Sequence, residues 1–178
     1  MHLKPALPWL ILAIAVWVAG VTWARLHRPV ASELRPEWQH SYLELDGDGR
    51  RTYAALREAI YEAENRRVDQ QAWSSPAALA ADGIAPFDQS PWELRLEGPY
   101  VNYLGESAGL RWLVLFIEPE RRLRSPGAPP APVDEEHHTL GDGTALHVTV
   151  WTRPAGGALA AGVASFPVVD GWVQRVGQ

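Results

Sequence analysis

The sequence of 178 residues contains no cysteine. Lipoprotein attachment and palmitoylation are therefore excluded, because both reactions modify a cysteine thiol. A chain without thiols suits an oxidising compartment as well as a reducing one, so the absence of cysteine does not indicate where the protein resides.

Basic side chains are in the minority, with 16 Lys and Arg against 21 Asp and Glu and a formal net charge of −5. Nucleic-acid binding needs a basic surface that releases counterions from the phosphates, so we expect no nucleic-acid partner. The sequence also has no internal repeat, no phosphate-binding loop and no cofactor fingerprint. These absences exclude several common classes of enzyme and of repeat protein.

One long apolar run, from Leu7 to Ala24, stands near the N-terminus and contains no charge over 18 residues. At a rise of about 1.5 Å per residue, a helix of this length reaches across the hydrocarbon core of a bilayer. Trp9 and Trp23 lie near its ends, where aromatic rings favour the headgroup layer. The sequence therefore predicts a tail over residues 1–6 and a single membrane anchor over residues 7–25.

A cleaved signal peptide is the alternative interpretation of this run. The run is longer than the usual apolar core of a signal peptide, and Arg25 and Arg28 would follow directly after cleavage at Ala24. Orientation is also open, because Lys4 and the α-amino group face Arg25, Arg28 and Arg35 across the run. Taken alone, the positive-inside rule leans weakly towards a cytoplasmic domain.

The rest of the chain predicts a linker over residues 26–49 and one soluble domain over residues 50–178. Pro29 and Pro36 interrupt any helix that leaves the membrane. Apolar residues then recur at helical spacing for about 20 residues: Tyr53, Leu56, Ile60 and Ala63. A second, short helix is indicated by a cap at Ser75, a proline at Pro76 and a stop at Gly83.

Beyond Phe87 the pattern changes to strands. Alternating or continuous apolar residues predict strands over residues 92–97, 100–104, 110–117 and 146–151, with residues 168–173 as a possible terminal strand. We expect an α+β domain in which a helix packs on an antiparallel sheet of about four strands. Pilins and pseudopilins have this order of elements, but the chain lacks their Gly-Phe processing site, so the likeness is architectural.

Residues 105–109 read Gly-Glu-Ser-Ala-Gly, the pattern of the serine nucleophile elbow of esterases. Asp134 or Asp142 and then His147 follow in the order of a catalytic triad. An elbow requires a helix after the serine, whereas residues 110–117 read as a strand. A five-residue hairpin loop explains the same letters, so we rank a serine esterase third among the candidate functions.

The best candidate site is an acidic and histidine-rich cluster, which we interpret as a metal site formed by Glu135, His137, His138 and His147. If residues 137–147 form a hairpin with a three-residue loop, His137 lies opposite His147 with Glu135 on the same face. A two-residue loop would instead pair His138 with His147 and bring in Glu136. Either register offers two imidazoles and a carboxylate, a set suited to Zn²⁺.

Four stretches of the domain stand out: YAALREAIY at 53–61, VNYLG at 101–105, VDEEHH at 133–138 and GTALH at 143–147. They resemble an uncharacterised family of bacterial envelope proteins with a single N-terminal anchor. That family is associated with the gene neighbourhood of metal-uptake transporters and has no established activity. The resemblance implies a domain outside the cytoplasm and transfers no catalytic residue.

Together these patterns predict a single-pass protein of the inner membrane whose domain lies in the periplasm. We expect a non-catalytic accessory protein that binds a protein partner, and no certain cofactor. The alternative is a metal-binding accessory to a zinc or manganese uptake transporter, with a transporter subunit as its partner. The chain contains nine tryptophans, most of which we expect to pack in the core, while those in excess of core needs can form an interaction surface.

Overall fold

The computed structural model describes residues 36–118, 135–156 and 162–177. The expected N-terminal tail and membrane anchor, residues 1–6 and 7–25, lie outside these ranges. Within the described ranges, no helix combines the length and the apolar character needed to cross a membrane. The described residues from Pro36 onward form one compact unit.

The main helix, α2, spans Gly47–Gln70 and starts at an aspartate cap. The Asp46 carboxylate accepts a hydrogen bond of 2.7 Å from the backbone N–H of Gly49, which satisfies a donor that the first helical turn leaves open. The short helix α3, Pro76–Ala81, starts in the same way, with Ser75 accepting from the N–H of Ala78. Both expected helices are confirmed.

Seven strands form a single sheet, ordered β1-β7-β6-β4-β3-β2, with β5 paired to β6. β1 and β7 run parallel, and the other pairs are antiparallel. The strands are β1 (Gln39–Ser41), β2 (Trp92–Glu97), β3 (Tyr100–Ser107), β4 (Leu110–Ile117), β5 (His137–Thr139), β6 (Ala145–Pro154) and β7 (Val173–Val176). The fold is therefore α+β with a mixed sheet. The four strands expected with an apolar pattern correspond to β2, β3, β4 and β6. The sequence does not show β1, β5 and β7 at these positions, because strands of three or four residues are too short for a period-two pattern.

The expected linker, residues 26–49, contains structure in its second half. β1 pairs with β7, and a turn of 3₁₀-helix, η1 (Tyr42–Glu44), leads from β1 towards α2. The compact unit therefore begins at Pro36 rather than after Gly49. The physical reason is that β1 is stabilised by a strand at the other end of the chain, which local sequence cannot indicate.

The expected terminal strand over residues 168–173 is wrong in position. Pro167–Asp170 forms a second 3₁₀-helix, η2, and the strand β7 begins only at Val173. Pro167 stands in the first turn of η2, where its fixed φ and missing N–H are tolerated.

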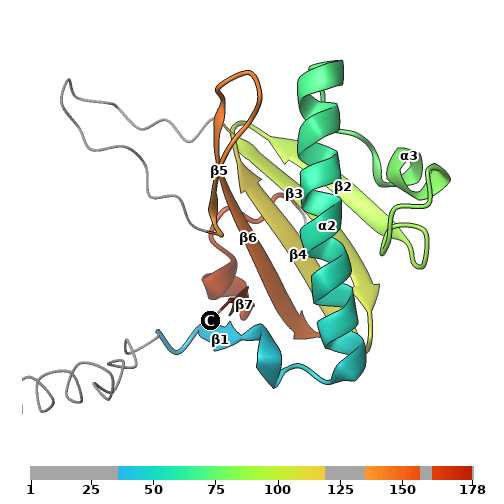
Figure 1. Ribbon diagram of the computed structural model, residues 1–178. Coiled ribbons are helices and arrows are strands. Elements are labelled where there is room, and N and C mark those ends of the chain that lie inside the picture. The colour runs from blue at the N-terminus through green and yellow to red at the C-terminus, as the bar shows by residue number, and fades with distance from the viewer. Residues whose placement is uncertain (1–35, 119–134, 157–161, 178) are drawn as a thin grey trace, which may run out of the picture. The chain divides into compact units, whose positions relative to one another are not determined.

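The sheet has two covered faces. Figure 1 shows α2 lying across one of them, which we call the helix face. The core on that face is built from residues of both helices and of the central strands, including Leu56, Ile60, Leu79, Tyr103, Trp112, Phe116, Leu146 and Val148. The opposite face, which we call the second face, carries a smaller apolar cluster: Leu104, Leu113, Leu115, Trp151 and Trp172. Trp172 comes from the segment between η2 and β7, so this segment covers part of the second face.

Candidate functional site

The hairpin of β5 and β6 holds the predicted histidine cluster. His137 lies opposite His147, His138 opposite Leu146 and Thr139 opposite Ala145. This is the register with a three-residue loop, and it is confirmed. The two imidazole rings of His137 and His147 stack at a centroid distance of 4.8 Å.

His138 lies on the other side of β5, because successive side chains of a strand point to opposite faces. Its Nδ1 is 2.6 Å from Oε1 of Glu64 in α2, and the two side chains are only 9% and 8% exposed. Its Nε2 lies 3.2 Å from the carbonyl oxygen of Glu135, and the Tyr61 ring stacks on it at 5.6 Å. The structure therefore separates His138 from the other two histidines.

The nearest carboxylate to the histidine pair is Glu136, not Glu135. One oxygen of Glu136 lies 3.2 Å from Nε2 of His147, and the other accepts a hydrogen bond of 2.7 Å from the Gln174 amide. The Glu135 carboxylate lies instead against the backbone of Gly177. The expected set of Glu135, His137, His138 and His147 is thus divided over three places.

A chain of polar groups continues from Glu136 across the sheet. Gln174 of β7 is buried, and its side-chain oxygen accepts a hydrogen bond of 3.0 Å from Gln39 of β1. These hydrogen bonds connect β1 and β7 to the hairpin and to His147, so they hold the Glu136 carboxylate in place. Sequence reasoning missed both glutamines, since no local pattern places residues 39 and 174 together.

The residues that could hold an ion here are Glu136, His137 and His147. The described part of the chain contains no group of three or more His, Asp or Glu side chains arranged as metal ligands. Imidazole lone pairs lie in the ring plane, so two stacked rings do not direct both nitrogens at one point. Binding of one ion by both histidines would require a ring to rotate.

The Gly-Glu-Ser-Ala-Gly motif forms the β3–β4 hairpin. Ser107 pairs with Leu110 across a two-residue turn in which Ala108 and Gly109 have φ of 53° and 69°. The Ser107 hydroxyl is 3.0 Å from that of Thr52 in α2. A strand follows the serine, as expected, although the loop is shorter than the five residues expected.

The described residues of the hypothetical triad, His147 and Asp142, do not meet Ser107. His147 pairs with Ile117, at the opposite end of β4 from Leu110. Asp142 lies in the β5–β6 turn, where it accepts from the N–H of Thr144, and Asp134 lies outside the described residues. The geometry thus lacks the contacts between serine, histidine and carboxylate that an esterase requires.

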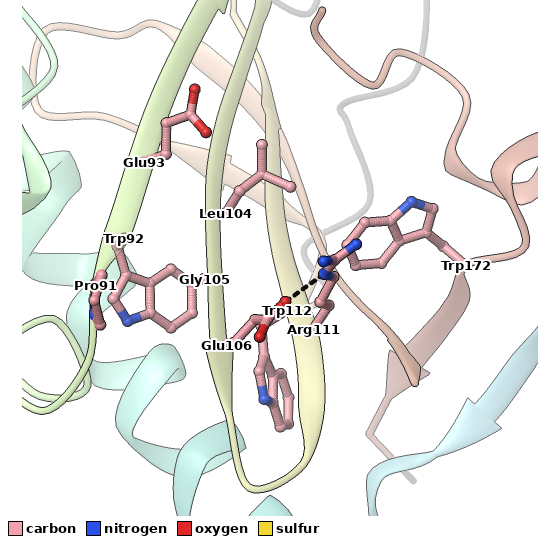
Figure 2. A pocket seen from close by; sticks show the side chains of 9 residues that line it. All are labelled: Pro91, Trp92, Glu93, Leu104, Gly105, Glu106, Arg111, Trp112 and Trp172. Carbon is pink, nitrogen blue, oxygen red and sulfur yellow. Dashed lines mark hydrogen bonds and ion pairs between the residues drawn. The ribbon is translucent and has the colours of Figure 1, made fainter. Parts of the chain in front are cut away.

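A cavity of about 360 Å³ lies beside β2, β3 and β4, and we call it the Trp172 pocket. It is lined by Pro91, Trp92, Glu93, Leu104, Gly105, Glu106, Arg111, Trp112 and Trp172 (Figure 2). In Figure 2, Leu104 lies between strand β2, which carries Trp92, and the segment that carries Trp172. Leu104 and Trp172, from the cluster on the second face, thus give the pocket an apolar wall, whereas the Trp92 and Trp112 side chains pack with the core of the helix face.

The walls of the Trp172 pocket are held rigidly. Trp172 is only 4% exposed, and the guanidinium of Arg153 lies 4.9 Å from its ring centroid. On the helix face, behind this wall, the Trp92 indole packs against Gly105 so closely that a Cβ at position 105 would overlap it, and the Phe87 ring supports it at 5.1 Å. A rigid, preformed wall lowers the entropy cost of binding.

Two ion pairs set the charge at the Trp172 pocket. Arg95 donates two hydrogen bonds to Glu93, at 2.9 and 3.0 Å, and Arg111 donates one of 2.5 Å to Glu106. The arginine side chains are 19% and 11% exposed, whereas the glutamates are 57% and 54% exposed. The hydrogen bonds from Arg95 lower the pKa of the Glu93 carboxyl, which keeps it ionised. The accessible charge at the pocket is therefore acidic.

Sequence reasoning did not predict the Trp172 pocket. The excess of tryptophan indicated an interaction surface in general, but the walls come from segments about 80 residues apart in the chain.

Comparison of the chain with family models, with curated proteins and with solved structures found no match in any of the three.

Proposed function

We propose that this protein is a non-catalytic, membrane-anchored accessory protein of the bacterial envelope, and that its domain binds a protein partner through the Trp172 pocket. The observation that carries the proposal is a preformed pocket with apolar walls and an acidic entrance. Its size falls within the range of about 300–1,000 Å³ that is usual for binding sites.

The chemistry of the Trp172 pocket favours a lysine or arginine of the partner. Such a side chain has an apolar stem, which the tryptophan and leucine walls would cover, and a cationic head, which Glu93 and Glu106 would attract. The stacking of Arg153 on Trp172 demonstrates that a guanidinium packs well on this ring. The net charge of −5 would also steer a basic partner towards the domain.

The uncharged run of residues 7–24 supports the anchor, and the family resemblance supports a domain in the periplasm. On this proposal the partner is an envelope protein at the same membrane, such as a transporter subunit. The likeness to pilins extends to a long helix across antiparallel strands, which is architecture only. We propose no assembly into a pilus.

A pull-down from detergent-solubilised membranes tests the proposal. The full chain serves as bait beside a Glu93→Gln/Glu106→Gln variant, which keeps the shape of the pocket and removes its charge. A Glu58→Gln/Asp69→Asn variant is the matched control, because both carboxylates are exposed on α2. We expect the partner to be lost from the pocket variant alone. Equal recovery with the pocket variant and the wild type would contradict the proposal.

The second candidate function is a metal-binding accessory to a zinc or manganese uptake transporter. The confirmed register of the hairpin, which brings His137 and His147 together beside Glu136, favours it. Titration of the protein with Zn²⁺ by calorimetry should give heats that disappear in a His137→Ala/His147→Ala variant and persist in His40→Ala, which removes an exposed histidine. Identical heats from the wild type and the double variant would rule this function out.

A further inference from the structure

Strand β2 ends the sheet on one side. In the strand order it has a single neighbour, β3, so in the described part of the chain its other edge carries no strand. With six residues, β2 is longer than the edge strand β1, which has three. Its Leu96 is 58% exposed although it lies on the helix face with Leu94 and Trp92. A long edge with an exposed leucine is a natural template for pairing with another chain.

The charged residues along β2 determine in which register a second copy of the strand can pair with it. Residues 93–97 read Glu-Leu-Arg-Leu-Glu, which is the same in both directions. An antiparallel pair of two such strands, related by a two-fold axis, sets the residues of one copy against those of the other. Centred on Arg95, that pairing opposes arginine with arginine and glutamate with glutamate, which is unfavourable. Centred on Leu94, it opposes each Arg95 with the Glu93 of the other copy.

We propose that two copies of this chain pair through their β2 edges, antiparallel and centred on Leu94, to form one continuous sheet. This inference goes beyond the proposed function, because it concerns self-association and not the partner of the Trp172 pocket. Two-fold interfaces of this kind use the same patch on both copies. In this arrangement the exposed Leu96 lies opposite Trp92 of the second copy, where apolar cross-strand pairs are stabilising.

A centre at Leu96 would also oppose Arg95 with a glutamate, Glu97. The strand ends at Glu97, because the β2–β3 turn begins at Gly98. That centre would therefore overlap only residues 95–97, whereas the centre at Leu94 overlaps nearly the whole strand. The longer overlap forms more backbone hydrogen bonds and is the arrangement that we infer.

Single cysteines test the register directly, because the natural chain has none. In the proposed register the two Leu94 positions face each other at a Cα separation of about 5 Å, whereas the two Leu96 positions lie roughly 14 Å apart. A disulfide requires Cα atoms within about 7 Å. Oxidation of the full chain in membranes should therefore give a covalent dimer with Leu94→Cys, and none with Leu96→Cys or with the exposed control Leu43→Cys.

Charge reversal gives a second readout that does not depend on cysteine. Arg95→Glu places a carboxylate opposite Glu93 in both cross-strand pairs, so it should weaken association of the detergent-solubilised chain by about tenfold or more. Glu93→Arg/Arg95→Glu exchanges the two charges and should restore it. Analytical sedimentation measures the association of both variants, and far-UV circular dichroism verifies that each variant is folded.

Several outcomes would overturn the inference. They are no covalent dimer from a folded Leu94→Cys variant, cross-linking that is stronger at Leu96, covalent products with other proteins instead of a second copy, or no rescue by the exchanged pair. The cysteine variants leave Glu93 and Glu106 intact. A chain that dimerises but recovers no partner therefore contradicts the proposed function alone, and the opposite result contradicts only the inference.

Discussion

Ala108 occupies a backbone conformation that alanine adopts reluctantly. Its φ of 53° is left-handed, and with Gly109 it forms the two-residue turn between β3 and β4. Turns of this type favour asparagine followed by glycine, because asparagine tolerates the left-handed region better than alanine does. We predict that Ala108→Asn raises the free energy of unfolding by about 0.5–1 kcal/mol, measured by urea unfolding. Gly109→Ala should lower it, and a destabilised Ala108→Asn variant would contradict the assigned turn.

Tyr103 makes the stability of the folded domain depend on pH. Its phenol is 1% exposed and donates a hydrogen bond of 2.7 Å to the carbonyl oxygen of Ser74, and burial raises its pKa well above the usual value. The unfolded chain releases this proton near pH 10, while the folded chain keeps it, so stability should fall as pH rises above about 10.

Tyr103→Phe removes this dependence, so we predict that the difference in unfolding free energy between the wild type and the variant depends on pH. At pH 8 it should be less stable than the wild type by about 1 kcal/mol, because the Ser74 carbonyl loses its donor. Between pH 10 and 11 the difference should shrink, since only the wild type has a phenol to ionise at this position. Urea unfolding at both pH values measures it. A constant difference would show that the phenol does not titrate differently in the two states.

At the scale of elements, one buried contact joins α2 to the β5–β6 hairpin. Glu64 and His138 form a hydrogen bond of 2.6 Å and are each less than a tenth exposed. We predict that Glu64→Ala lowers the free energy of unfolding by about 2–4 kcal/mol, because it leaves a buried imidazole without its partner. Chemical denaturation of the full chain in detergent measures this loss.

Two further variants isolate the contact. Glu64→Leu/His138→Leu should cost clearly less than the sum of its single changes, because apolar groups can replace a buried polar pair. Glu58→Ala, on the exposed side of α2, should stay within about 0.5 kcal/mol of the wild type. Additive effects of the Glu64 and His138 changes would mean that the two side chains do not interact.

The elements that could be predicted from sequence are those with local signals. Asp46 and Ser75 start their helices with side-chain caps that are readable within four residues. The register of the β5–β6 hairpin was predictable because Leu140 and Leu146 must both be buried, which sets His137 opposite His147. The sequence does not indicate which carboxylate turns towards the pair, so the expected ligand set names Glu135 where the structure places Glu136 beside His147.

The parts that escaped prediction depend on contacts between distant residues. β1 exists because β7 pairs with it, and the amides of Gln39 and Gln174 meet although 135 positions separate them. The Trp172 pocket likewise arises where a late segment crosses strands formed earlier in the chain. Hydrophobic periodicity and helix caps depend on residues within one element, so they do not predict contacts between residues far apart in the sequence.

At the scale of the whole molecule, the main prediction concerns topology. We predict that the N-terminus lies in the cytoplasm and the domain outside it, as the family resemblance implies. A reporter that is active only outside the cytoplasm should be active when fused after Gln178. A reporter that is active only in the cytoplasm should be silent at the same position, and activity of that reporter would reverse the proposed orientation.

The parallel pairing of β1 with β7 has a consequence for the order of events during synthesis. β1 is one of the first parts of the domain to be made, and the only strand with which it pairs in the described structure is the last. β1 therefore has no partner strand until Val173–Val176 has emerged from the ribosome. A chain truncated before Val173 should therefore lack the β1–β7 pair and present the β1 edge without a partner strand.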